Sequence, residues 1–364
     1  MKEKLKVGII GATGYVGQRF VRLLDEHPWF EIKKLAASPR SAGKSYKEAP
    51  EGRRLFAEEG PAKAESLTVE TVTPETAEAF AKGLDLCFCA VNMPKPEIVA
   101  LEEALAKAEL PVISNNSANR MQEDVPVIIP EVNPGHSRII SAQRKRLGCR
   151  NGFIACKPNC SIQSYVPALS PLRKFGIEEI FVSTYQAISG AGKTFETWPE
   201  MEHNVIPYIG GEEEKSETEP LKLWGEVKNN KIVLNDTIKI SAHCFRVAVQ
   251  EGHTASVTVK FKNKPSREEI LKIWDEQRTL PQKLELPSAP EKFLHYMEDN
   301  DRPQPRLDAA RDKGMAVWIS RLRDDNILDY RFSCLSHNTL RGAAGGAVET
   351  AELLYKTGEI RRRS

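Results

Sequence analysis

The feature that most constrains this chain is a glycine-rich turn between a short apolar segment and an amphipathic one. The apolar run at 5–10 is typical of a buried strand, and glycines follow its start at positions 8, 11, 14 and 17. The stretch from Gln18 to His27 carries apolar residues at helical spacing. Glycines at such a turn let the backbone approach a pyrophosphate and aim the helix N-terminus at its charge. The pattern predicts a dinucleotide-binding α/β unit, and a tight turn without a ligand is the alternative.

The residues after the second predicted strand, at 31–37, bear on which dinucleotide is bound. NAD-specific proteins usually place an acidic residue there for the adenosine ribose. This chain instead has Ser38, Arg40 and Ser41, whose hydroxyls and guanidinium suit a 2′-phosphate. We therefore predict NADP as the cofactor, with a solvated turn as the alternative for these residues.

The length of 364 residues suits about two domains, and the pattern of elements changes near residue 158. Before that point, short strands and helices alternate, as a doubly wound parallel sheet requires. After it, longer strand-like segments indicate an α+β domain built on a mixed sheet, at 179–186, 237–249, 255–261, 315–322 and 330–335. A last apolar helix at 343–355 is expected to pack back on the first domain.

Composition excludes several classes of function. The 52 Lys plus Arg nearly balance 50 Asp plus Glu, so a net charge of +2 does not draw the chain to nucleic acid or anionic lipid. No run of about 18 apolar residues is present, and Met1 to Lys4 lead directly into a strand without room for a signal peptide. We expect a cytoplasmic protein with no membrane or nucleic-acid partner. Seven cysteines without C-x-x-C spacing, and scattered histidines, argue against a disulfide framework and against a metal site.

One of the seven cysteines differs from the others in its surroundings. The other six lie in apolar runs or lack an activating neighbour in the sequence. Cys160 follows Pro158 and Asn159, which end the preceding strand, and the segment 161–175 is predicted to be helical up to an interruption at Pro171. At a helix N-terminus, unpaired backbone N–H groups and the helix dipole favour a thiolate. Cys160 is therefore the candidate reactive thiol.

Polar residues at strand ends in the second region are further candidates. Arg246 and His253 flank one loop, and a histidine beside a glycine there is well placed to meet a thiolate and to act as acid or base. From spacing alone, a structural or exposed histidine is the simpler explanation. The acidic run at 212–214 is typical of a solvated loop, and His243, on a predicted strand, is typical of a packed core histidine.

Beyond these patterns, the chain resembles the aspartate-semialdehyde dehydrogenase family, specifically its archaeal and fungal branch. The resemblance extends from Val7 to the C-terminal helix and rests on several motifs in the same order. They are GATGYVG at 11–17, SNNSANR at 114–120, KPNCS at 157–161, YQAISGAG at 185–192, NVIP at 204–207, EEEK at 212–215, Arg246 with His253, and HNTLRGAAGG at 337–346.

The resemblance implies a fold. It implies an α/β protein with an N-terminal Rossmann-type NADP-binding domain and an α+β catalytic and dimerisation domain of the semialdehyde dehydrogenase type, similar to glyceraldehyde-3-phosphate dehydrogenase. We place the first domain at residues 1–158, completed by the C-terminal helix at 336–364, and the second at 159–335. The resemblance also implies a homodimer or homotetramer.

The resemblance also implies a role for each matching residue. Cys160 is the expected nucleophile, His253 the general acid and base, and Gln186 the residue that orients the acyl intermediate. The expected substrate ligands are Arg246 for the α-carboxylate, Glu212 for the α-ammonium group, and Lys215, Arg120 and Asn159 for the phosphate. The residues expected to contact NADP are Gly11, Thr13, Gly14, Tyr15, Val16, Ser38, Arg40, Ser41, Ser189, Gly190 and Asn338.

The implied reaction is the reversible reduction of 4-phospho-L-aspartate to aspartate 4-semialdehyde, with release of phosphate. Cys160 forms a thioester, NADPH delivers a hydride to it, and backbone N–H groups at the Cys160 helix terminus are expected to stabilise the tetrahedral oxyanion. This places the chain on the route to lysine, threonine, methionine and isoleucine. Two departures from the family pattern, Ala248 and the segment 193–198, are expected to change the shape of the loop over the cofactor.

Three alternatives remain open at this point. A malonyl-CoA reductase shares the scaffold, the cysteine and NADPH, but in that family the Pro-Asn-Cys motif and the pair Glu212 and Lys215 are altered, so their presence favours the amino-acid substrate. An N-acetyl-glutamyl-phosphate reductase has no need of a carboxylate for an acetylated amine. A non-catalytic NADP-binding module has no need of Cys160 or His253.

Overall fold

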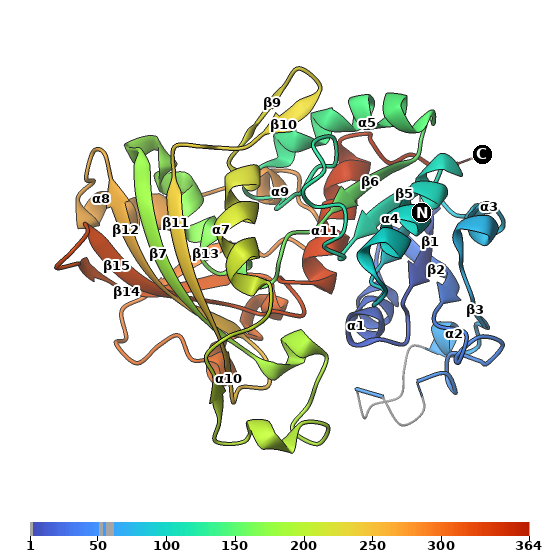
Figure 1. The fold of residues 1–364 in the computed structure, drawn as a ribbon, viewed down its shortest axis with the longest axis horizontal. Coiled ribbons are helices and arrows are strands. Elements are labelled where there is room, and N and C mark those ends of the chain that lie inside the picture. Colours follow the sequence, from blue (N-terminus) through green and yellow to red (C-terminus); the bar gives the residue numbers. More distant parts are fainter. Residues whose placement is uncertain (1–2, 51–53, 56–61, 364) are drawn as a thin grey trace.

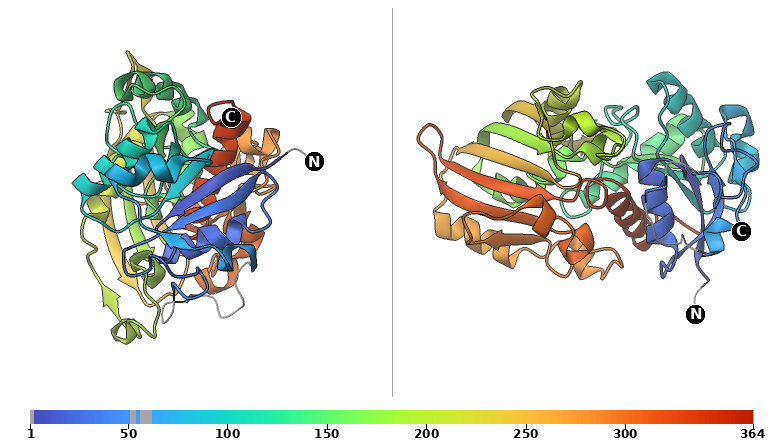
Figure 2. Two further views of the ribbon diagram at one scale, coloured as in Figure 1. Left: turned by 90° about the vertical axis from the view of Figure 1, so that its right-hand side faces the viewer. Right: turned by 90° about the horizontal axis from the view of Figure 1, so that it is seen from below.

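The structure is a computed structural model that describes residues 3–50, 54–55 and 62–363. Two sheets lie at opposite ends of the molecule, and helix α11 (Ala344–Lys356) lies between them (Figures 1 and 2). The first sheet has the order β3-β2-β1-β4-β5-β6 and is parallel throughout. This is the strand order of a doubly wound dinucleotide-binding sheet, as predicted. Its strands are β1 (Leu5–Ile10), β2 (Phe30–Ala36), β3 (Val69–Glu70), β4 (Leu86–Cys89), β5 (Pro111–Ser114) and β6 (Phe153–Cys156).

Helices cover both faces of the first sheet, which explains why β4, β5 and β6 are buried at every position rather than alternating. Along β4, Leu86 and Phe88 pack with α1 (Tyr15–Leu24) and α11. Cys87 and Cys89 point to the opposite face and pack with α3 (Ala77–Ala81) and α4 (Lys95–Lys107). Both thiols are therefore core residues, as their apolar surroundings predicted. The other elements of this part are α2 (Ala62–Glu65), η1 (Pro74–Thr76), η2 (Pro134–Ile139) and α5 (Ile140–Leu147).

The glycine-rich turn is required by close backbone contacts. Gly11 has φ of +90°, and a Cβ there would lie 2.2 Å from the carbonyl oxygen of Ala90. A Cβ on Gly17 would lie 2.0 Å from the carbonyl oxygen of Gly11. Gly14 is the N-cap of α1, which begins at Tyr15, three residues before the predicted start. The turn therefore exposes a helix N-terminus and a stretch of backbone without bulky side chains.

The second sheet is mixed, as predicted, in the order β13-β14-β15-β12-β7-β11-β8. Its strands are β7 (Ile177–Gln186), β8 (Val205–Ile206), β11 (Lys239–Val247), β12 (His253–Phe261), β13 (Leu294–Met297), β14 (Val317–Asp324) and β15 (Tyr330–Ser336), with a separate hairpin of β9 (Glu226–Lys228) and β10 (Lys231–Val233). The other elements are η3 (Ser161–Gln163), α6 (Val166–Leu169), η4 (Ser170–Phe175), η5 (Ile188–Ala191), η6 (Pro199–Met201), α7 (Glu212–Leu223), α8 (Arg267–Glu276), α9 (Leu280–Lys283), α10 (Pro305–Asp308) and η7 (Arg311–Gly314). A capping box formed by Ser266 and Glu269 begins α8.

One face of this second sheet is open on β7 and β11. Phe181 and Tyr185 on β7 are 51% and 40% exposed, and Tyr185 stacks on Phe245 of β11. His243 lies on this open face and is exposed. The expectation that His243 is a packed core residue is therefore wrong, because residues alternate between the two faces of a strand and Ala242 and Cys244 take the inner one.

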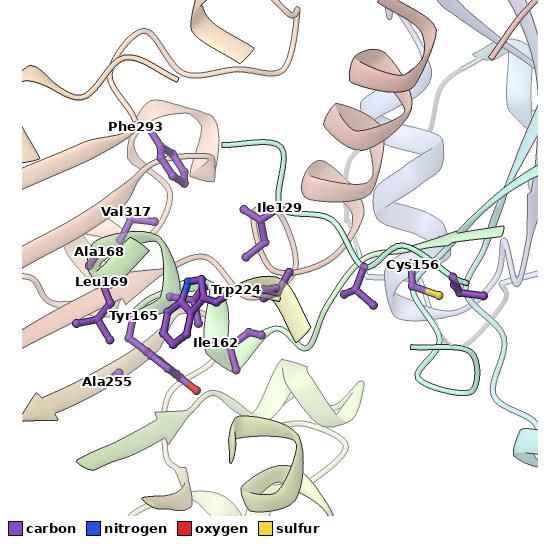
Figure 3. Close-up of a cluster of buried hydrophobic side chains, with 14 of the residues drawn as sticks. Ile129, Cys156, Ile162, Tyr165, Ala168, Leu169, Trp224, Ala255, Phe293 and Val317 are labelled. Carbon is purple, nitrogen blue, oxygen red and sulfur yellow. The ribbon is translucent and has the colours of Figure 1, made fainter. Parts of the chain in front are cut away.

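A continuous apolar core joins the two sheets. Figure 3 shows this cluster reaching from Cys156, at the end of β6, through Tyr165 and Trp224 to Ala255 and Val317 on the second sheet. The C-terminal helix α11 packs on the other face of the first sheet, against α1 and β5, which confirms that it returns to the first domain (Figure 2). The two sheets therefore share one apolar core.

The segment 161–175 is not the helix that was predicted. It consists of two 3₁₀ segments, η3 and η4, with the four-residue helix α6 between them. Pro167 and Pro171 stand near the starts of α6 and η4, and a proline cannot donate the backbone hydrogen bond that a continuing helix needs. Cys160 therefore caps a single 3₁₀ turn and not a helix of several turns.

Among the described residues, no helix combines the length and the apolar character that a membrane crossing requires.

Candidate active site

A cleft of about 530 Å³ lies between the carboxyl edge of the first sheet and the loops of the second. The segment 157–160 follows β6 directly and enters the cleft, anchored by a hydrogen bond from the Lys157 N–H to the Ser114 carbonyl. Residues from both domains share this cleft, among them Arg120, Asn159, Cys160, Ser189, Gly190, Glu212, Lys215 and Asn338. With Val16, which also lines it, the cleft brings together nine of the residues predicted for substrate, cofactor and catalysis.

The thiol of Cys160 faces the imidazole of His253. The distance from Cys160 Sγ to His253 Nε2 is 3.4 Å, although the residues lie 93 positions apart. Cys160 is partly exposed, whereas the other six cysteines are buried. His253 is the first residue of β12 and is fully buried. The pair is the arrangement that an activated cysteine nucleophile requires.

The other ring nitrogen of His253 determines which tautomer is present. The backbone N–H of Ala187 donates to His253 Nδ1 at 3.0 Å, so Nδ1 carries a lone pair. Burial holds the pKa of His253 well below its usual range, and Arg246, His337 and Lys157 act in the same direction. The neutral ring therefore carries its proton on Nε2, which points at Cys160. In this state His253 is a hydrogen-bond donor toward the sulfur.

The surroundings of Cys160 do not favour the thiolate in the way its predicted helix terminus suggested. Burial raises the pKa of the Cys160 thiol, and the Glu212 carboxylate raises it further. Lys157, Arg246 and Arg120 act in the opposite direction without reversing the shift. A single 3₁₀ turn supplies little dipole, so the positive side chains are what favour the thiolate.

The backbone N–H groups on either side of Cys160 are already engaged. The N–H of Asn159 donates to Glu219 Oε2 at 2.6 Å, and the N–H of Ser161 donates to Asn159 Oδ1 at 2.8 Å. These two groups are therefore not free to form the oxyanion site expected at the helix terminus. The Nε2–H of His253 is the donor that faces the reacting sulfur instead.

Arg246 lies at the end of β11, beside Gln186 on β7. Its Nη1 donates to the Ala187 carbonyl at 2.7 Å, and the side chain is largely buried. A Cβ on Gly190 would lie 2.9 Å from Arg246 Nη1 and 3.2 Å from His253 Nε2. Gly190 therefore packs directly on both side chains, and only a glycine leaves room for them.

Glu212, at the start of α7, accepts hydrogen bonds from several polar side chains. Asn159 Nδ2 donates to both of its carboxylate oxygens at 3.0 Å, and Lys215 Nζ donates to Oε1 at 2.8 Å. Burial opposes the charge, but Lys215, Asn159 and Gln186 together hold the pKa of Glu212 below its ordinary value. The acidic run is thus the first turn of α7 and not a solvated loop, because Glu212 turns inward to these partners.

Arg120 is paired with Glu219, a residue that sequence reasoning missed. Arg120 Nη1 donates to Glu219 Oε1 at 2.8 Å, and its Nη2 donates to the Asn115 carbonyl. Glu219 also holds the N–H of Asn159 and so ties α7 to the residue before the nucleophile. The only signal for Glu219 in the sequence is its spacing. It follows Ser216 by one helical turn, which places it on the buried side of α7.

Lys157 and Glu251 were also missed. Lys157 lines the cleft, is buried, and its Nζ has no hydrogen-bond partner among the described residues. Glu251 accepts hydrogen bonds from Tyr15 and Thr339 and forms ion pairs with Arg19 and His337. Both stand next to predicted residues in the chain, Lys157 within the KPNCS motif and Glu251 two residues before His253.

The glycine turn opens on a second cleft, of about 770 Å³. Thr13, Gly14 and Tyr15 line one side, and the segment 192–197 lines the other. The departure noted at 193–198 therefore does lie over the glycine turn. Bare backbone at a helix N-terminus, which would meet a pyrophosphate, fits a dinucleotide at this position.

The residues predicted for the 2′-phosphate lie on the turn after β2. Ser38 and Arg40 are exposed, and neither lines the two clefts described. Ser41 is buried, and its Oγ has no hydrogen-bond partner among the described residues. On the other side, Asn338 donates to Ser189 Oγ at 2.8 Å and accepts from the Gly252 N–H. Seven of the residues predicted to contact the cofactor line the two clefts, and four line neither. Thr13, Gly14 and Tyr15 line the larger cleft and Val16, Ser189, Gly190 and Asn338 the smaller one, whereas Gly11, Ser38, Arg40 and Ser41 line neither.

Comparisons with known proteins agree with this geometry. Residues 6–140 match the family described as semialdehyde dehydrogenase, NAD binding domain, and residues 169–341 match semialdehyde dehydrogenase, dimerisation domain, which points to a homo-oligomer. The aspartate-semialdehyde dehydrogenases of Archaeoglobus fulgidus and Saccharomyces cerevisiae are 41% and 40% identical, each over 97% of this chain and 98% of the relative.

Solved structures give the same result. The aspartate-semialdehyde dehydrogenase of Candida albicans with NADP is similar at a TM-score of 0.87 and 37% identity, over 98% of this chain and all of that one. Aspartate-semialdehyde dehydrogenase II of Vibrio cholerae, complexed with ASA, is similar at a TM-score of 0.74 and 26% identity, over 97% and 99% of the two chains. Identity near 40% over almost the whole length, with the same two domains in the same order, shows that this chain belongs to the aspartate-semialdehyde dehydrogenase family.

Proposed function

We propose that the chain catalyses the reversible, NADPH-dependent conversion of 4-phospho-L-aspartate to L-aspartate 4-semialdehyde and phosphate, a step of aspartate-family amino-acid biosynthesis. The observation that carries the proposal is the Cys160 thiol at 3.4 Å from His253 Nε2, in a cleft that also holds the charged pair of Glu212 and Lys215. A nucleophile, a proton donor and paired charges for an amino-acid substrate suit acyl transfer from an acyl phosphate.

The substrate is proposed to lie between the two domains. Arg246, at the end of β11, receives the α-carboxylate, and Glu212 receives the α-ammonium group. Lys215, Arg120 and Asn159 hold the phosphate. Since Arg120 and Lys215 are each paired with a carboxylate in this structure, binding of phosphate has to share these cations with Glu219 and Glu212. Gln186, beside Glu212, orients the acyl group.

Catalysis is proposed to begin at the sulfur. The Cys160 thiolate attacks the acyl carbon, the bond to phosphate breaks, and a thioester remains on Cys160. NADPH supplies the hydride that reduces the thioester. The Nε2–H of His253 then donates to the oxygen of the tetrahedral species, and collapse of the carbon–sulfur bond releases the aldehyde and restores the thiolate.

The cofactor is proposed to be NADP, held by the turn at 11–16 and by Ser189, Gly190 and Asn338. Ser41 Oγ is buried and has no hydrogen-bond partner among the described residues, so its hydroxyl is available to donate to the ligand. The guanidinium of Arg40 is exposed and can move to contact a 2′-phosphate. We also propose the boundaries 1–158 with 336–364 and 159–335 for the two domains. A homodimer or homotetramer is proposed to form on the open face of β7 and β11, where Phe181 and Tyr185 are exposed.

The experiment that tests this function is a reverse assay with purified protein. Aspartate semialdehyde, phosphate and NADP should yield NADPH, and omission of phosphate should abolish the signal. Cys160→Ser should remove turnover but leave NADPH binding intact. A silent assay together with reduction of malonyl-CoA would contradict the substrate and favour the malonyl-CoA reductase alternative.

A further inference from the structure

Two residues that line the cleft of Cys160 carry buried polar groups without a partner. Lys157 is 2% exposed, and its Nζ has no hydrogen-bond partner among the described residues. The side-chain amide oxygen and nitrogen of Asn115 are also buried, and neither has a partner in the same part of the chain. A buried polar group without a partner is costly, and a buried ammonium more so. Such groups at the wall of a cleft are expected to meet a ligand.

The strand register places Lys157 and Asn115 next to each other. Ser114 at the end of β5 pairs with Cys156 at the end of β6, and Asn115 and Lys157 are the residues that follow. The backbone N–H of Lys157 donates to the Ser114 carbonyl at 2.8 Å. Arg120 Nη2 donates to the next carbonyl, that of Asn115, at 2.9 Å. All three residues are therefore anchored at the carboxyl ends of two adjacent strands.

The charge of Lys157 is not balanced, unlike that of the other cations in the cleft. Arg120 and Lys215 are each paired with a carboxylate at 2.8 Å, and Lys95 is exposed to water. Of the described cations that line the cleft, Lys157 alone is both buried and unpaired. Burial lowers the pKa of Lys157 to about 7, and a bound anion would favour the ammonium and raise it again. An anion that enters the cleft is therefore the partner that Lys157 lacks.

We propose that Lys157, together with the side-chain amide of Asn115, is a ligand of the phosphate group of the substrate and of free phosphate in the reverse reaction. The Lys157 ammonium and the Asn115 Nδ2–H donate to phosphate oxygens, and the Arg120 guanidinium binds beside them. This inference rests on the proposed function in taking phosphate as the group that leaves the acyl carbon. It adds two ligands to the three residues proposed above for phosphate.

The charge of phosphate explains why the site needs a further cation. A phosphate monoester carries about −1.5 to −2 charges near pH 7, and a buried anion is stable only when it is paired with positive charge. Arg120 shares its charge with Glu219, and Lys215 shares its charge with Glu212. Both pairs are neutral before phosphate binds. Lys157 supplies the positive charge that no carboxylate shares.

The pyrophosphate of the cofactor is the other phosphate that could reach Lys157. The glycine turn that is proposed to hold it opens on the larger cleft, which is lined by Thr13, Gly14 and Tyr15 and not by Lys157. Lys157 instead lines the smaller cleft, which holds Cys160, and phosphate has to leave the acyl carbon beside that thiol. The geometry therefore favours the phosphate that takes part in the reaction.

The test uses purified protein and inorganic phosphate, without substrate or cofactor and at an ionic strength held constant with sodium chloride. Phosphate in this cleft should slow the alkylation of Cys160 by iodoacetamide, and Cys160 is the one cysteine of the seven that is not buried. The phosphate concentration that halves the rate is measured, because this ratio does not depend on the rate without phosphate. Lys157→Met should raise it by about 10–100-fold, as expected for loss of a charged hydrogen bond. Asn115→Ala should raise it by about 2–10-fold, as expected for a neutral one.

Three controls separate a phosphate ligand from general damage. Lys95→Met also removes a positive charge from the lining of the cleft, but at an exposed position, so the half-protecting concentration should stay within about threefold of the wild type. In the reverse assay, Lys157→Met should raise the KM for phosphate and leave the KM for NADP near its wild-type value. Lys157→Met removes an unpaired buried charge and should have a melting temperature at or above that of the wild type.

Three results would overturn the proposal. One is an equal half-protecting concentration for the wild type and Lys157→Met, and another is a wild-type protein whose alkylation phosphate does not slow. The third is a rise in the KM for NADP without a rise in that for phosphate, which would assign Lys157 to the cofactor. Because the alkylation assay contains no substrate, a silent reverse assay combined with protection that depends on Lys157 would contradict the proposed function alone.

Discussion

The backbone N–H of Ala187 donates a hydrogen bond to His253 Nδ1 at 3.0 Å, and this contact places the proton of the neutral ring on Nε2. Ala187 directly follows β7, and His253 begins β12, which pairs with β7. The tautomer is thus determined by the register of two neighbouring strands. It makes His253 a donor toward the sulfur and toward any oxygen that forms beside it.

The first prediction follows from this tautomer. His253→Gln keeps an N–H donor but cannot take up or release a proton at neutral pH, so kcat should fall by about 10²–10⁴-fold. Steady-state kinetics of the reverse reaction measure this loss. A variant with kcat near that of the wild type would mean that the hydrogen bond alone, without proton transfer, accounts for the role of His253.

The second prediction concerns Gly190. In Gly190→Ala the new methyl group would lie 2.9 Å from Arg246 Nη1 and 3.2 Å from His253 Nε2, so both side chains have to move. A displacement of this size at reacting groups should lower kcat/KM by about 10²-fold. Gly210→Ala is the matched control, because nothing lies within 4 Å of its Cβ position. Equal kinetics for the two variants would show that Gly190 does not set this geometry.

The first sheet and the nucleophile could be predicted from the sequence because their signals are local. Strand, glycine turn and helix follow one another within 5–27, and Cys160 stands inside a short motif. The doubly wound class of the sheet followed from the same local alternation of elements. Arg246 and His253 could be named, but only their family resemblance distinguished them from structural residues.

The rest depended on contacts between distant residues. Glu219 is 99 positions from Arg120, and Glu251 is 236 positions from Tyr15, so no local pattern indicates these pairs. His243 was assigned to the wrong face because a short alternating strand can present either set of residues to the core. The segment 161–175 does not form the predicted helix, because its two prolines interrupt the pattern of backbone hydrogen bonds.

The third prediction tests Glu219. Glu219→Gln leaves the buried Arg120 guanidinium without a counter-charge, and breaking a buried ion pair in this way costs about 3–5 kcal/mol. Urea unfolding should show this loss in the free energy of unfolding. Glu214→Gln, on the exposed side of the same helix, should change it by less than about 0.5 kcal/mol. A Glu219→Gln protein as stable as Glu214→Gln would rule out a structural role for the pair.

The fourth prediction tests the choice of cofactor. Arg40→Asp replaces a cation that suits a 2′-phosphate by an anion that suits a ribose hydroxyl. The ratio of kcat/KM for NADP over that for NAD should fall by about 10–100-fold, as expected for loss of a charged hydrogen bond of about 1.5–3 kcal/mol. Lys44→Asp, an equally exposed charge reversal nearby, should leave the ratio near the wild-type value. No change in Arg40→Asp would remove the argument for the 2′-phosphate.

The fifth prediction concerns the carboxylate of Glu251, which joins the first helix of the dinucleotide domain to the second domain. It accepts a hydrogen bond from Tyr15 and pairs with Arg19 on α1, and it pairs with His337 after β15. Burial opposes its charge, but His337 and Arg19 outweigh burial and lower the pKa of Glu251 to about 2. Glu251→Gln should therefore weaken the junction between the domains.

The pH dependence of that loss follows from the sign of the shift. A pKa that is lower in the folded protein than its ordinary 4.5 stabilises the fold above pH 4.5, and this contribution disappears as the pH falls toward 2. Urea unfolding should show Glu251→Gln less stable than wild type by about 1–3 kcal/mol at pH 7, with a smaller difference at about pH 3. Glu196→Gln, at an exposed position, should match the wild type at both values. A difference for Glu251→Gln that does not shrink on acidification would show that its packing, and not its charge, joins the domains.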